Sequence, residues 1–415
     1  MHKKSFRFAV VATSLTLIAN LWNALPGNCA YEGPSPAALQ AATSANAFGL
    51  ALYQRISDSQ PGQNCFISPL SVALCLNMAA CGSAGATRTA MHKSLHLPGT
   101  TFDSASAFNA LLKDLQTNDG EIELNIADAM FVNSKIPLKT QYVKGIGAAF
   151  QSNIQNENFH NSGRVLGKIN KWCSDKTRGH ITGIVNGVNP NDSALLLNAI
   201  YFKGQWQEPF PEESTKPGIF AQPGHHPLRV QYMKQDDGFD YLAEKDFQAI
   251  RLPYKFARFD SLIFLPRKGL KLDSFRKQFT PANWNKWGDK LSYHANGHLE
   301  LPRFHVDFSE SLNQSLTALG MGIAFTNQAN FSRMHIAGPG LKLTEVIHKT
   351  TLDVDEKGTV ATAMTFTNVG ATSGAPSPDE PFRMIVDRPF IYAIRDSQTG
   401  AILFIGSICK PENLR

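Results

Sequence analysis

The sequence predicts an α+β fold, with helices gathered in the first half of the chain and strands in the second. Up to residue 176, apolar residues recur every three or four positions, which is typical of helices. After residue 190 they form continuous or alternating runs, which are typical of strands. The chain has 415 residues, of which 43% are hydrophobic and 18% charged, enough for a large core. Since no linker or internal repeat divides it, we expect one intermingled domain over residues 31–415.

The helices are predicted from apolar periodicity and from residues that start or stop a helix. Ser68 can cap a helix that has Pro69 in its first turn, is apolar on nearly every side and ends at Gly82. A helix without a polar face belongs in the middle of a core. Amphipathic or partly apolar helices are expected at 34–57, 85–95, 104–116 and 161–176.

The strands are predicted from apolar runs and period-2 alternation. The run from Ala194 to Phe202 is continuously apolar, as in a strand that is buried on both faces. Residues 298–308 nearly alternate, with a slip at Pro302, and a short helix is expected after them, over 309–320. Further strands are expected at 259–266 and 344–355, together with a β-hairpin over 390–409.

The N-terminus has the pattern of a secretory signal peptide. Lys3, Lys4 and Arg7 precede an apolar run from Phe8 to Leu21 that is too short to cross a bilayer comfortably. We expect residues 1–30 to be removed after Ala30. The remaining chain has no segment apolar enough for a membrane helix, so we expect a protein without a membrane partner, secreted to the exterior or, in a bacterium, to the periplasm.

Charge and metal-ligand patterns give weak signals. The net charge of +6 does not indicate nucleic-acid binding. The basic run RKGLKLDSFRK (Arg267–Lys277) is able to bind a sulfated polysaccharide, although a solvated helix face is the favoured interpretation. His225 and His226 form a pair without a third ligand in view, so a solvated loop is favoured over a metal site. We expect neither a metal nor a cofactor.

The cysteines do not indicate a disulfide framework. The chain has six of them, and no pair shows C-x-x-C spacing. Four of the six lie among apolar residues, which favours buried thiols that act as small hydrophobic side chains over disulfide bridges. These four are Cys65, Cys75, Cys81 and Cys409.

The motifs of common catalytic sites are missing from the sequence. It contains no G-x-S-x-G, H-E-x-x-H, P-loop or G-x-G-x-x-G pattern, which disfavours a hydrolase or nucleotide-dependent enzyme. His348 is more informative, because it shares the apolar face of a predicted strand with Val346 and Leu352. A buried histidine needs hydrogen-bond partners, and a satisfied core histidine is the simplest interpretation.

The stretch Thr359–Pro376 carries no charged residue. Its first half is rich in β-branched residues and fits a strand, whereas its second half is rich in Gly, Ser and Pro and reads as irregular chain. With the preceding strand, and a short turn that contains Gly358, it has the pattern of a β-hairpin. From the residues alone, it is either an ordinary sheet element or a strand that pairs only in another state.

Several segments, in order along the chain, resemble the serpin family. They span residues 41–411 and comprise NCFISPLSVALCLNMAACGSAGAT, INKWCSDKTRGHI, LLLNAIYFKGQW, LPRFHVDFSESLNQSLTALGM, EVIHKTTLDVDEKGT and DRPFIYAIRD…ILFIGSIC. Each of these matches is weak alone, but six in family order are specific. The resemblance implies a helix-rich half packed on three β-sheets, with an exposed reactive-centre loop at about 356–381.

The resemblance also implies an inhibitor of serine proteases, and sometimes of cysteine proteases. The protease cuts the loop as a substrate, and the loop then inserts as a strand into the central sheet and traps the acylated enzyme. Family register implies a reactive bond between Thr372 and Ser373, and a slip of register would make Ala371 or Ser373 the specificity residue. Because all of these are small, we expect elastase- or subtilisin-like targets. The implied hinge comprises Glu356, Gly358, Thr359, Ala361 and Ala363.

Further positions follow from the same resemblance. It places Trp206 where the loop enters the sheet, and it implies a polar cluster that controls sheet opening, formed by Ser68, Ser71, Asn198 and His348. Two departures from inhibitory members are Val360, where a charged residue is usual, and the bulky Phe366. We expect a monomer. The alternative is a non-inhibitory serpin that acts as a carrier, chaperone or storage protein.

Overall fold

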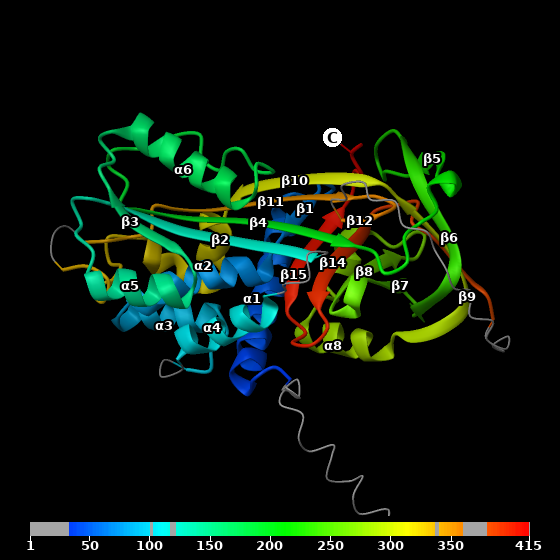
Figure 1. Cartoon of the computed structure of the whole chain (residues 1–415), viewed down its shortest axis with the longest axis horizontal. Coiled ribbons are helices and arrows are strands. Elements are labelled where there is room, and N and C mark those ends of the chain that lie inside the picture. The colour runs from blue at the N-terminus through cyan, green and yellow to red at the C-terminus, as the bar shows by residue number, and fades with distance from the viewer. Residues whose placement is uncertain (1–32, 100–102, 117–121, 337–339, 360–379, 415) are drawn as a thin grey trace, which may run out of the picture. The chain divides into compact units, whose positions relative to one another are not determined.

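The described strands form two hydrogen-bonded sheets, one of six strands and one of nine, in a computed structural model of the chain (Figure 1). The structure describes residues 33–99, 103–116, 122–336, 340–359 and 380–414. The signal peptide expected at 1–30 and most of the expected reactive loop, including Ala361, Ala363, Thr372 and Ser373, lie outside these ranges.

The six-stranded sheet carries Gly358 and Thr359 of the expected hinge and Asn198 and His348 of the expected polar cluster. Its strand order is β10-β11-β12-β4-β2-β3, and β11 also pairs directly with β4. Most of its pairs are antiparallel, whereas β11–β4 and β2–β3 are parallel. The bounds are Phe304–Ser311 for β10, Glu345–Val354 for β11, Gly358–Thr359 for β12, Ala194–Gln205 for β4, Ile122–Asn133 for β2 and Asn153–Glu157 for β3.

Each face of this sheet is covered by a different helix. The amphipathic helix α6 (Ser162–Lys176) packs Val165, Ile169 and Cys173 onto one face, where they form a small separate core with residues of β2 and β4. The other face rests on α2 (Pro69–Gly82), whose residues are buried almost without exception. Figure 1 shows the sheet lying between α6 and the remaining helices of the N-terminal half. The prediction of an apolar central helix is therefore confirmed.

The nine-stranded sheet has the order β1-β15-β14-β8-β7-β6-β9-β13, with β5 added to β6. The resemblance predicts three sheets, and the described strands form two networks because the 16-residue β6 pairs in turn with β5, β9 and β7. The bounds are Cys65–Ile67 for β1, Ile402–Ile408 for β15, Phe390–Asp396 for β14, Phe259–Pro266 for β8, Phe247–Pro253 for β7, Leu228–Ala243 for β6, Ser292–Pro302 for β9, Phe382–Ile385 for β13 and Lys216–Phe220 for β5.

The remaining helices follow their local signals. The side chain of Ser68 accepts a hydrogen bond from the Ser71 amide at 3.2 Å and so caps α2, with Pro69 in the first turn, as predicted. The predicted helices at 34–57, 85–95 and 104–116 are confirmed as α1, α3 and α4. The bounds are Pro36–Ser59 for α1, Gly85–Ser94 for α3, Ser104–Leu115 for α4, Thr140–Ala149 for α5, Leu272–Arg276 for α7, Pro281–Lys290 for α8 and Asn313–Leu316 for α9.

Two sequence predictions around Pro302 are wrong. Residues 298–308 form parts of two strands, β9 and β10, which belong to different sheets, and Arg303 lies between them. The slip in alternation at Pro302 marks this change of sheet. The helix predicted over 309–320 begins only at Asn313, because Ser309–Ser311 continue β10, and it becomes irregular before Gly320, whose φ is 105°.

The cysteine prediction is confirmed for the described residues. Cys65, Cys75, Cys173 and Cys409 are buried and Cys81 is half-buried, and all five are free. Burial raises the pKa of the Cys65 thiol to about 12, so this side chain is neutral at physiological pH. A search of the described helices finds none with the length and apolar character needed to cross a membrane.

Candidate functional site: a split sheet and its polar cluster

The expected hinge begins inside the six-stranded sheet. Gly358 and Thr359 form β12, which lies antiparallel between β11 and β4, with Thr359 opposite Val354 on one side and Gly204 on the other. Below this point β11 and β4 pair directly with each other, from Glu345 to Thr350 on the β11 side. The sheet is therefore split at one end, where the loop begins, and closed where β11 and β4 pair directly.

Gly358 is required by the way β12 enters the sheet. Its φ is 155°, a conformation that side chains with a Cβ rarely adopt. A Cβ at this position would lie 2.1 Å from the carbonyl oxygen of Gly204, which belongs to the backbone of the adjacent strand. Only glycine allows the chain to approach β4 so closely.

The side chain of Thr359 is fully buried in a cluster of hydroxyl groups. Its Oγ1 lies 2.6 Å from the Tyr254 hydroxyl, which is 2.7 Å from Ser261 Oγ and 3.1 Å from the Tyr392 hydroxyl. Ser261 Oγ and the Tyr392 hydroxyl lie 2.6 Å apart. Burial raises the pKa of Tyr254 well above its usual value, so the phenol is neutral. The core of the split end is thus polar, uncharged and internally satisfied.

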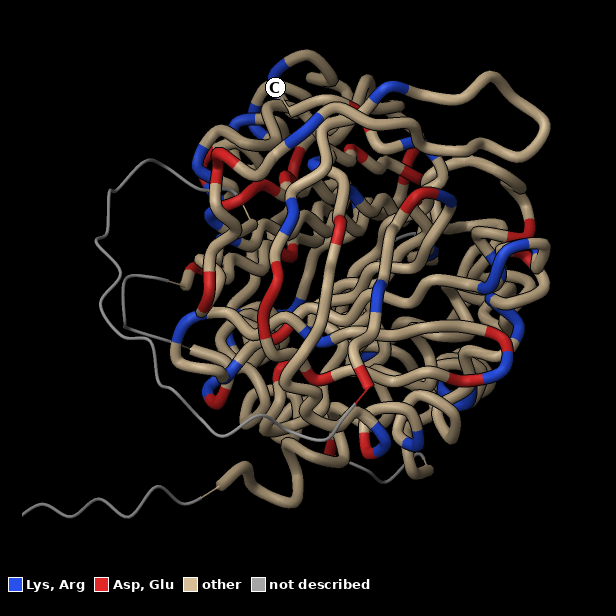
Figure 2. Tube along the Cα trace, turned by 90° about the vertical axis from the view of Figure 1, so that its right-hand side faces the viewer, with Lys and Arg blue, Asp and Glu red and all other residues tan. Residues whose placement is uncertain are grey.

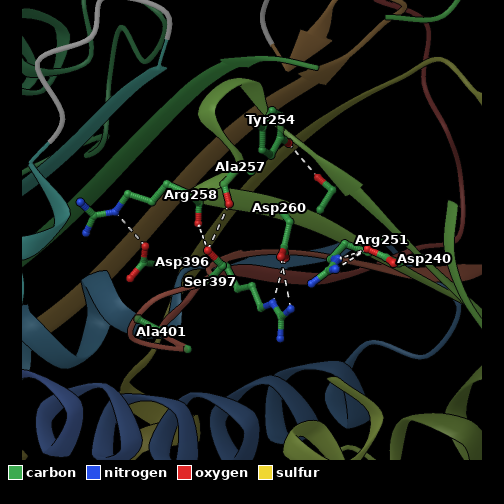
Figure 3. A network of polar contacts seen from close by, with 12 residues as sticks. Asp240, Arg251, Tyr254, Ala257, Arg258, Asp260, Asp396, Ser397 and Ala401 are labelled. Atoms are coloured by element: carbon green, nitrogen blue, oxygen red, sulfur yellow. Dashed lines mark hydrogen bonds and ion pairs between the residues drawn. The ribbon is translucent and has the colours of Figure 1, made fainter. Parts of the chain in front are cut away.

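Ion pairs hold the turn that carries Tyr254. Figure 3 shows Tyr254 close to Ala257 and Arg258, which belong to the turn between β7 and β8. Arg258 Nε donates to Asp396 at 2.9 Å, and the hydroxyl of Ser397 donates to the carbonyl oxygen of Arg258 at 2.7 Å. These contacts tie the β7–β8 turn to the β14–β15 hairpin, and they fix the position of the Tyr254 ring under the hinge.

Trp206 lies directly beside the turn before the hinge. Its indole Nε1 donates to the carbonyl oxygen of Asp355 at 2.9 Å, and its backbone amide donates to that of Lys357 at 2.9 Å. The ring is buried and stacks on Tyr254 with centroids 4.6 Å apart. The residue that the resemblance places where the loop enters is therefore in contact with the start of the loop.

Glu356 anchors the same turn through its carboxylate, which is buried. Its Oε1 accepts hydrogen bonds from Arg303 Nε at 2.6 Å and from the Thr215 hydroxyl. Arg303 is the single residue between β9 and β10, and Thr215 directly precedes β5. The acidic residue of the expected hinge thus ties the start of the loop to both sheets.

The four residues of the expected polar cluster meet under the closed part of the sheet. His348 on β11 and Asn198 on β4 are opposite each other, with Nδ1 of His348 2.5 Å from Oδ1 of Asn198. The Ser68 amide donates to His348 Nε2 at 3.0 Å, which fixes the proton of the neutral ring on Nδ1. The Asn198 amide then donates to Ser71 Oγ. Burial lowers the pKa of His348 to about 3, so the ring is neutral at physiological pH.

The structure adds Asp128 to this cluster. Asp128 lies opposite Asn198 on β2, and its Oδ1 accepts a hydrogen bond from Asn198 Nδ2 at 2.5 Å. His348, Asn198 and Asp128 therefore form one row across three strands. Burial raises the pKa of the Asp128 carboxyl to about 7, and within the described residues its Oδ2 has no hydrogen-bond partner. Sequence analysis missed Asp128. The signal that could have found it is an aspartate in a largely apolar stretch (NIADAMF), because a buried carboxyl needs hydrogen-bond partners.

The basic run carries less free charge than its sequence indicates. Arg276 is buried and pairs with Asp58 and Asp273, while Arg267 and Lys268 pair with Asp246 and Asp387. Basic and acidic residues are interspersed in the view of Figure 2. Among the described residues, no group of three or more His, Cys, Asp or Glu side chains is arranged to hold a metal ion, and His225 and His226 lie on an exposed turn.

Comparison with known proteins agrees with this architecture. The family model for serpins (serine protease inhibitors) matches residues 43–411. Serine protease inhibitor 42Dd of Drosophila melanogaster is 31% identical over 367 residues, which cover 87% of this chain and 95% of that protein. Corticosteroid-binding globulin of Oryctolagus cuniculus is 30% identical over 375 residues, which cover 88% of this chain and 94% of that protein.

Solved structures give the same result at the level of the fold. Human thyroxine-binding globulin superposes with a TM-score of 0.82 and 25% sequence identity, over 91% of this chain and all of that chain. The α+β fold predicted from the sequence is confirmed, with the helices and sheets described above. The chain belongs to the serpin family.

Proposed function

We propose that this protein inhibits serine endopeptidases of elastase or subtilisin type by the suicide-substrate route. The protease cuts the loop between Thr372 and Ser373, the N-terminal arm of the cut loop inserts between β11 and β4, and the acylated enzyme is carried along and inactivated. The protein is then consumed as a pseudo-substrate and is not an enzyme. Serpins generally act on target proteases, and the family also includes carriers, so the argument depends on the hinge of this chain.

The observation that carries the proposal is the position of β12. Thr359 already pairs with both β11 and β4, so the first step of insertion needs no new opening of the sheet. Its side chain is fully buried among hydroxyl groups. If β12 were extended, each following residue would pair with the next residue along β11 and the next residue along β4.

The pairing register of β12 with β11 and β4 predicts the position of each residue that would insert after it. Continued residue by residue, it places Thr365 opposite Asn198 on β4 and His348 on β11, with its side chain on the same face as that of Thr359. A hydroxyl at that level can accept from His348 Nδ1 and donate to Asn198 Oδ1. Insertion would then replace the hydrogen bond between these two side chains with two new ones.

The composition of the arm also supports insertion. The residues that alternate with Thr359 on the same face are neutral and small or of modest size: Ala361, Ala363, Thr365, Thr367 and Val369. A charge at any of them would have to be buried, at a cost of several kcal/mol. About ten residues at roughly 3.3 Å each form a strand of about 33 Å, which suits the length of a central strand. The uncut protein is then a kinetically trapped state.

The specificity proposal depends on the residues around the cut. Thr372 and its neighbours Ala371 and Ser373 are all small, and a small side chain gains little from a deep pocket that is built for arginine or phenylalanine. Proteases with shallow primary pockets are therefore the proposed targets. We also propose that the protein is secreted, which would place it in the compartment in which such proteases act. We further propose that it is a monomer.

The test is to mix the protein with pancreatic-type elastase or with subtilisin and to separate the products on a denaturing gel. The expected result is an adduct that survives denaturation, together with a rise in thermal stability of the cut protein. A second outcome is a cut protein that is more stable than the parent but forms no adduct. In that case the loop inserts too slowly to trap the protease, and the protein is only a substrate. If cleavage brings no rise in stability, the alternative holds, and the protein is a non-inhibitory carrier, chaperone or storage protein.

A further inference from the structure

A cavity of about 380 Å³ lies at the end of the nine-stranded sheet where β14 begins and β15 ends. Five segments line it: the loop that follows β8, the turn that follows β5, the residues that lead into β14, Gly62 between α1 and β1, and Cys409 directly after β15. None of them belongs to the hinge or to the polar cluster. The size falls within the range of cavities that hold drug-sized ligands, about 300–1,000 Å³.

The wall of the cavity is largely apolar. Leu270, Leu272, Pro266 and Pro389 contribute side chains, and Cys409 adds a thiol. Burial raises the pKa of Cys409 to about 11, so the thiol is neutral and acts as part of the apolar surface. A wall of this kind favours a ligand with an apolar body.

Side chains with N–H donors, two of them from Lys and Arg, line the same cavity. Lys271 and His225 are exposed, and neither has a carboxylate partner among the described residues. Arg388 is held in place, because its Nε donates to the Pro266 carbonyl oxygen at 2.8 Å and its Nη1 donates to Asp387 at 2.6 Å. Its Nη2 contacts no acceptor in the described part of the chain. The one carboxylate in the wall, Asp273, is paired with Arg276 at 2.7 Å.

Two sequence features that have no part in inhibition meet at this cavity. Lys271 comes from the basic run Arg267–Lys277, whose residues Arg267, Lys268 and Arg276 are paired with carboxylates. His225 comes from the histidine pair and closes a β-turn in which its amide donates to Gln222 at 3.0 Å. Gly224 in that turn has a φ of 79°, which glycine adopts without strain. The turn thus presents His225 to the cavity.

We propose that this cavity is a binding site for a small hydrophobic anion, a molecule with an aryl or alkyl body and one carboxylate, sulfonate or sulfate group. The body fills the apolar wall, and the anionic group lies among Lys271, His225 and Arg388. Arginine and lysine bind such groups through charge-assisted hydrogen bonds, which are stronger than neutral ones. The site is independent of loop insertion, and a cut protein keeps it.

The test uses a pair of fluorescent probes that differ in one charge. 1-Anilinonaphthalene-8-sulfonate carries the anion, and N-phenyl-1-naphthylamine has the same rings without it. We expect saturable one-site binding of the sulfonate to the full-length protein, with at least tenfold weaker binding of the neutral probe. Decanoate should displace the sulfonate, and decanol should not.

Charge variants locate the site. Lys271→Gln and His225→Glu should each weaken sulfonate binding by about three- to tenfold, since the first removes a positive charge at the cavity and the second introduces a negative one. Lys277→Gln is the matched control, because Lys277 belongs to the same basic run and lines no part of the cavity. Equal affinity for the two probes, unchanged affinity in Lys271→Gln, or an equal loss in Lys277→Gln would each overturn the proposal.

Discussion

The two ends of the region where β11 and β4 run side by side differ in the side chains that lie between or under the strands. At the split end, Thr359 separates the strands and lies on the neutral hydroxyl groups of Tyr254, Ser261 and Tyr392. At the closed part, His348 and Asn198 bridge the strands directly through one short hydrogen bond. The first region already holds one residue between the two strands, whereas in the second any parting of the strands would require His348 and Asn198 to exchange hydrogen-bond partners.

This difference separates two tasks within one sheet. In the proposed mechanism, the split end would determine whether insertion can begin, and it would require a compact, uncharged side chain at Thr359. The closed part would determine whether insertion can proceed, because the direct hydrogen bond between His348 and Asn198 must break before the strands part. Substitutions in the two regions should therefore have different consequences, and this expectation can be tested.

The largest effect is expected from Thr359→Arg. The arginine would replace a side chain that is fully buried among hydroxyl groups that offer no counter-charge, so it would displace β12 and the arm would lose its starting position between β11 and β4. We expect the protease to cut the loop at a normal rate while the denaturant-resistant adduct falls at least a hundredfold, as measured by gel densitometry and inhibition stoichiometry. Val360→Arg is the control, since strand alternation continued from Thr359 would place this side chain on the other face of an inserted strand. Undiminished trapping by Thr359→Arg would refute the proposed role of the hinge.

The next effect is expected from His348→Leu. The change leaves the Ser68 amide and the Asn198 oxygen without partners in a buried site, at about 1–3 kcal/mol for each group. We expect a loss of about 3 kcal/mol in the unfolding free energy of the uncut protein, and faster loss of activity on warming. Denaturant unfolding and timed activity assays measure the two effects. His160→Leu, at an exposed histidine, should change neither.

A pH-dependent effect is expected from Asp128→Asn. The folded-state pKa of Asp128 is about 7 and the unfolded value is near 3.8, so the carboxyl destabilises the fold increasingly as the pH rises from about 4 to about 7. The shift sets an upper limit of about 4 kcal/mol. We expect the variant to be more stable than the parent by about 2 kcal/mol at pH 8 and to match it near pH 3.5, by thermal unfolding at each pH.

Asp175→Asn is the matched control for that measurement, because Asp175 is an exposed partner of Lys171 on α6. Its stability difference from the parent should stay below about 0.5 kcal/mol at every pH. A stability gain in Asp128→Asn that is the same at pH 3.5 and pH 8 would show that ionisation of the carboxyl is not its cause.

The smallest effect is expected from Thr365→Val, a change of nearly equal volume. The valine can enter the sheet but offers no hydroxyl to His348 and Asn198, so the inserted state loses about 1 kcal/mol or somewhat more. The uncut protein should be unchanged, while the cut protein unfolds at a lower temperature than the cut parent. Thr367→Val, two residues further on, is the matched control. Identical melting of both cut proteins would show that the register does not continue from β12.

Much of this site follows from the sequence, because its members break local rules. The sequence alone shows a histidine on the apolar face of a strand, and it also shows a long neutral stretch without proline. Tyr254, Ser261 and Tyr392 do not, because each has an ordinary place in a strand or turn, and only the packing of β7, β8 and β14 brings their hydroxyls under Thr359. The change of sheet at Pro302 is hard to predict for a related reason, since the sequence shows it only as a one-residue slip in the alternation.

The start of the loop belongs to β12 in the six-stranded sheet, and Phe382 begins β13, which pairs in parallel with β9 in the nine-stranded sheet. The intervening chain is fastened at both ends to different structural frames. An intact segment can advance into the first sheet only as far as its anchorage in the second permits. In the proposed mechanism, cleavage of a single peptide bond between these two anchors would remove that restraint, so the trigger would be topological and would need no signal to pass through the core.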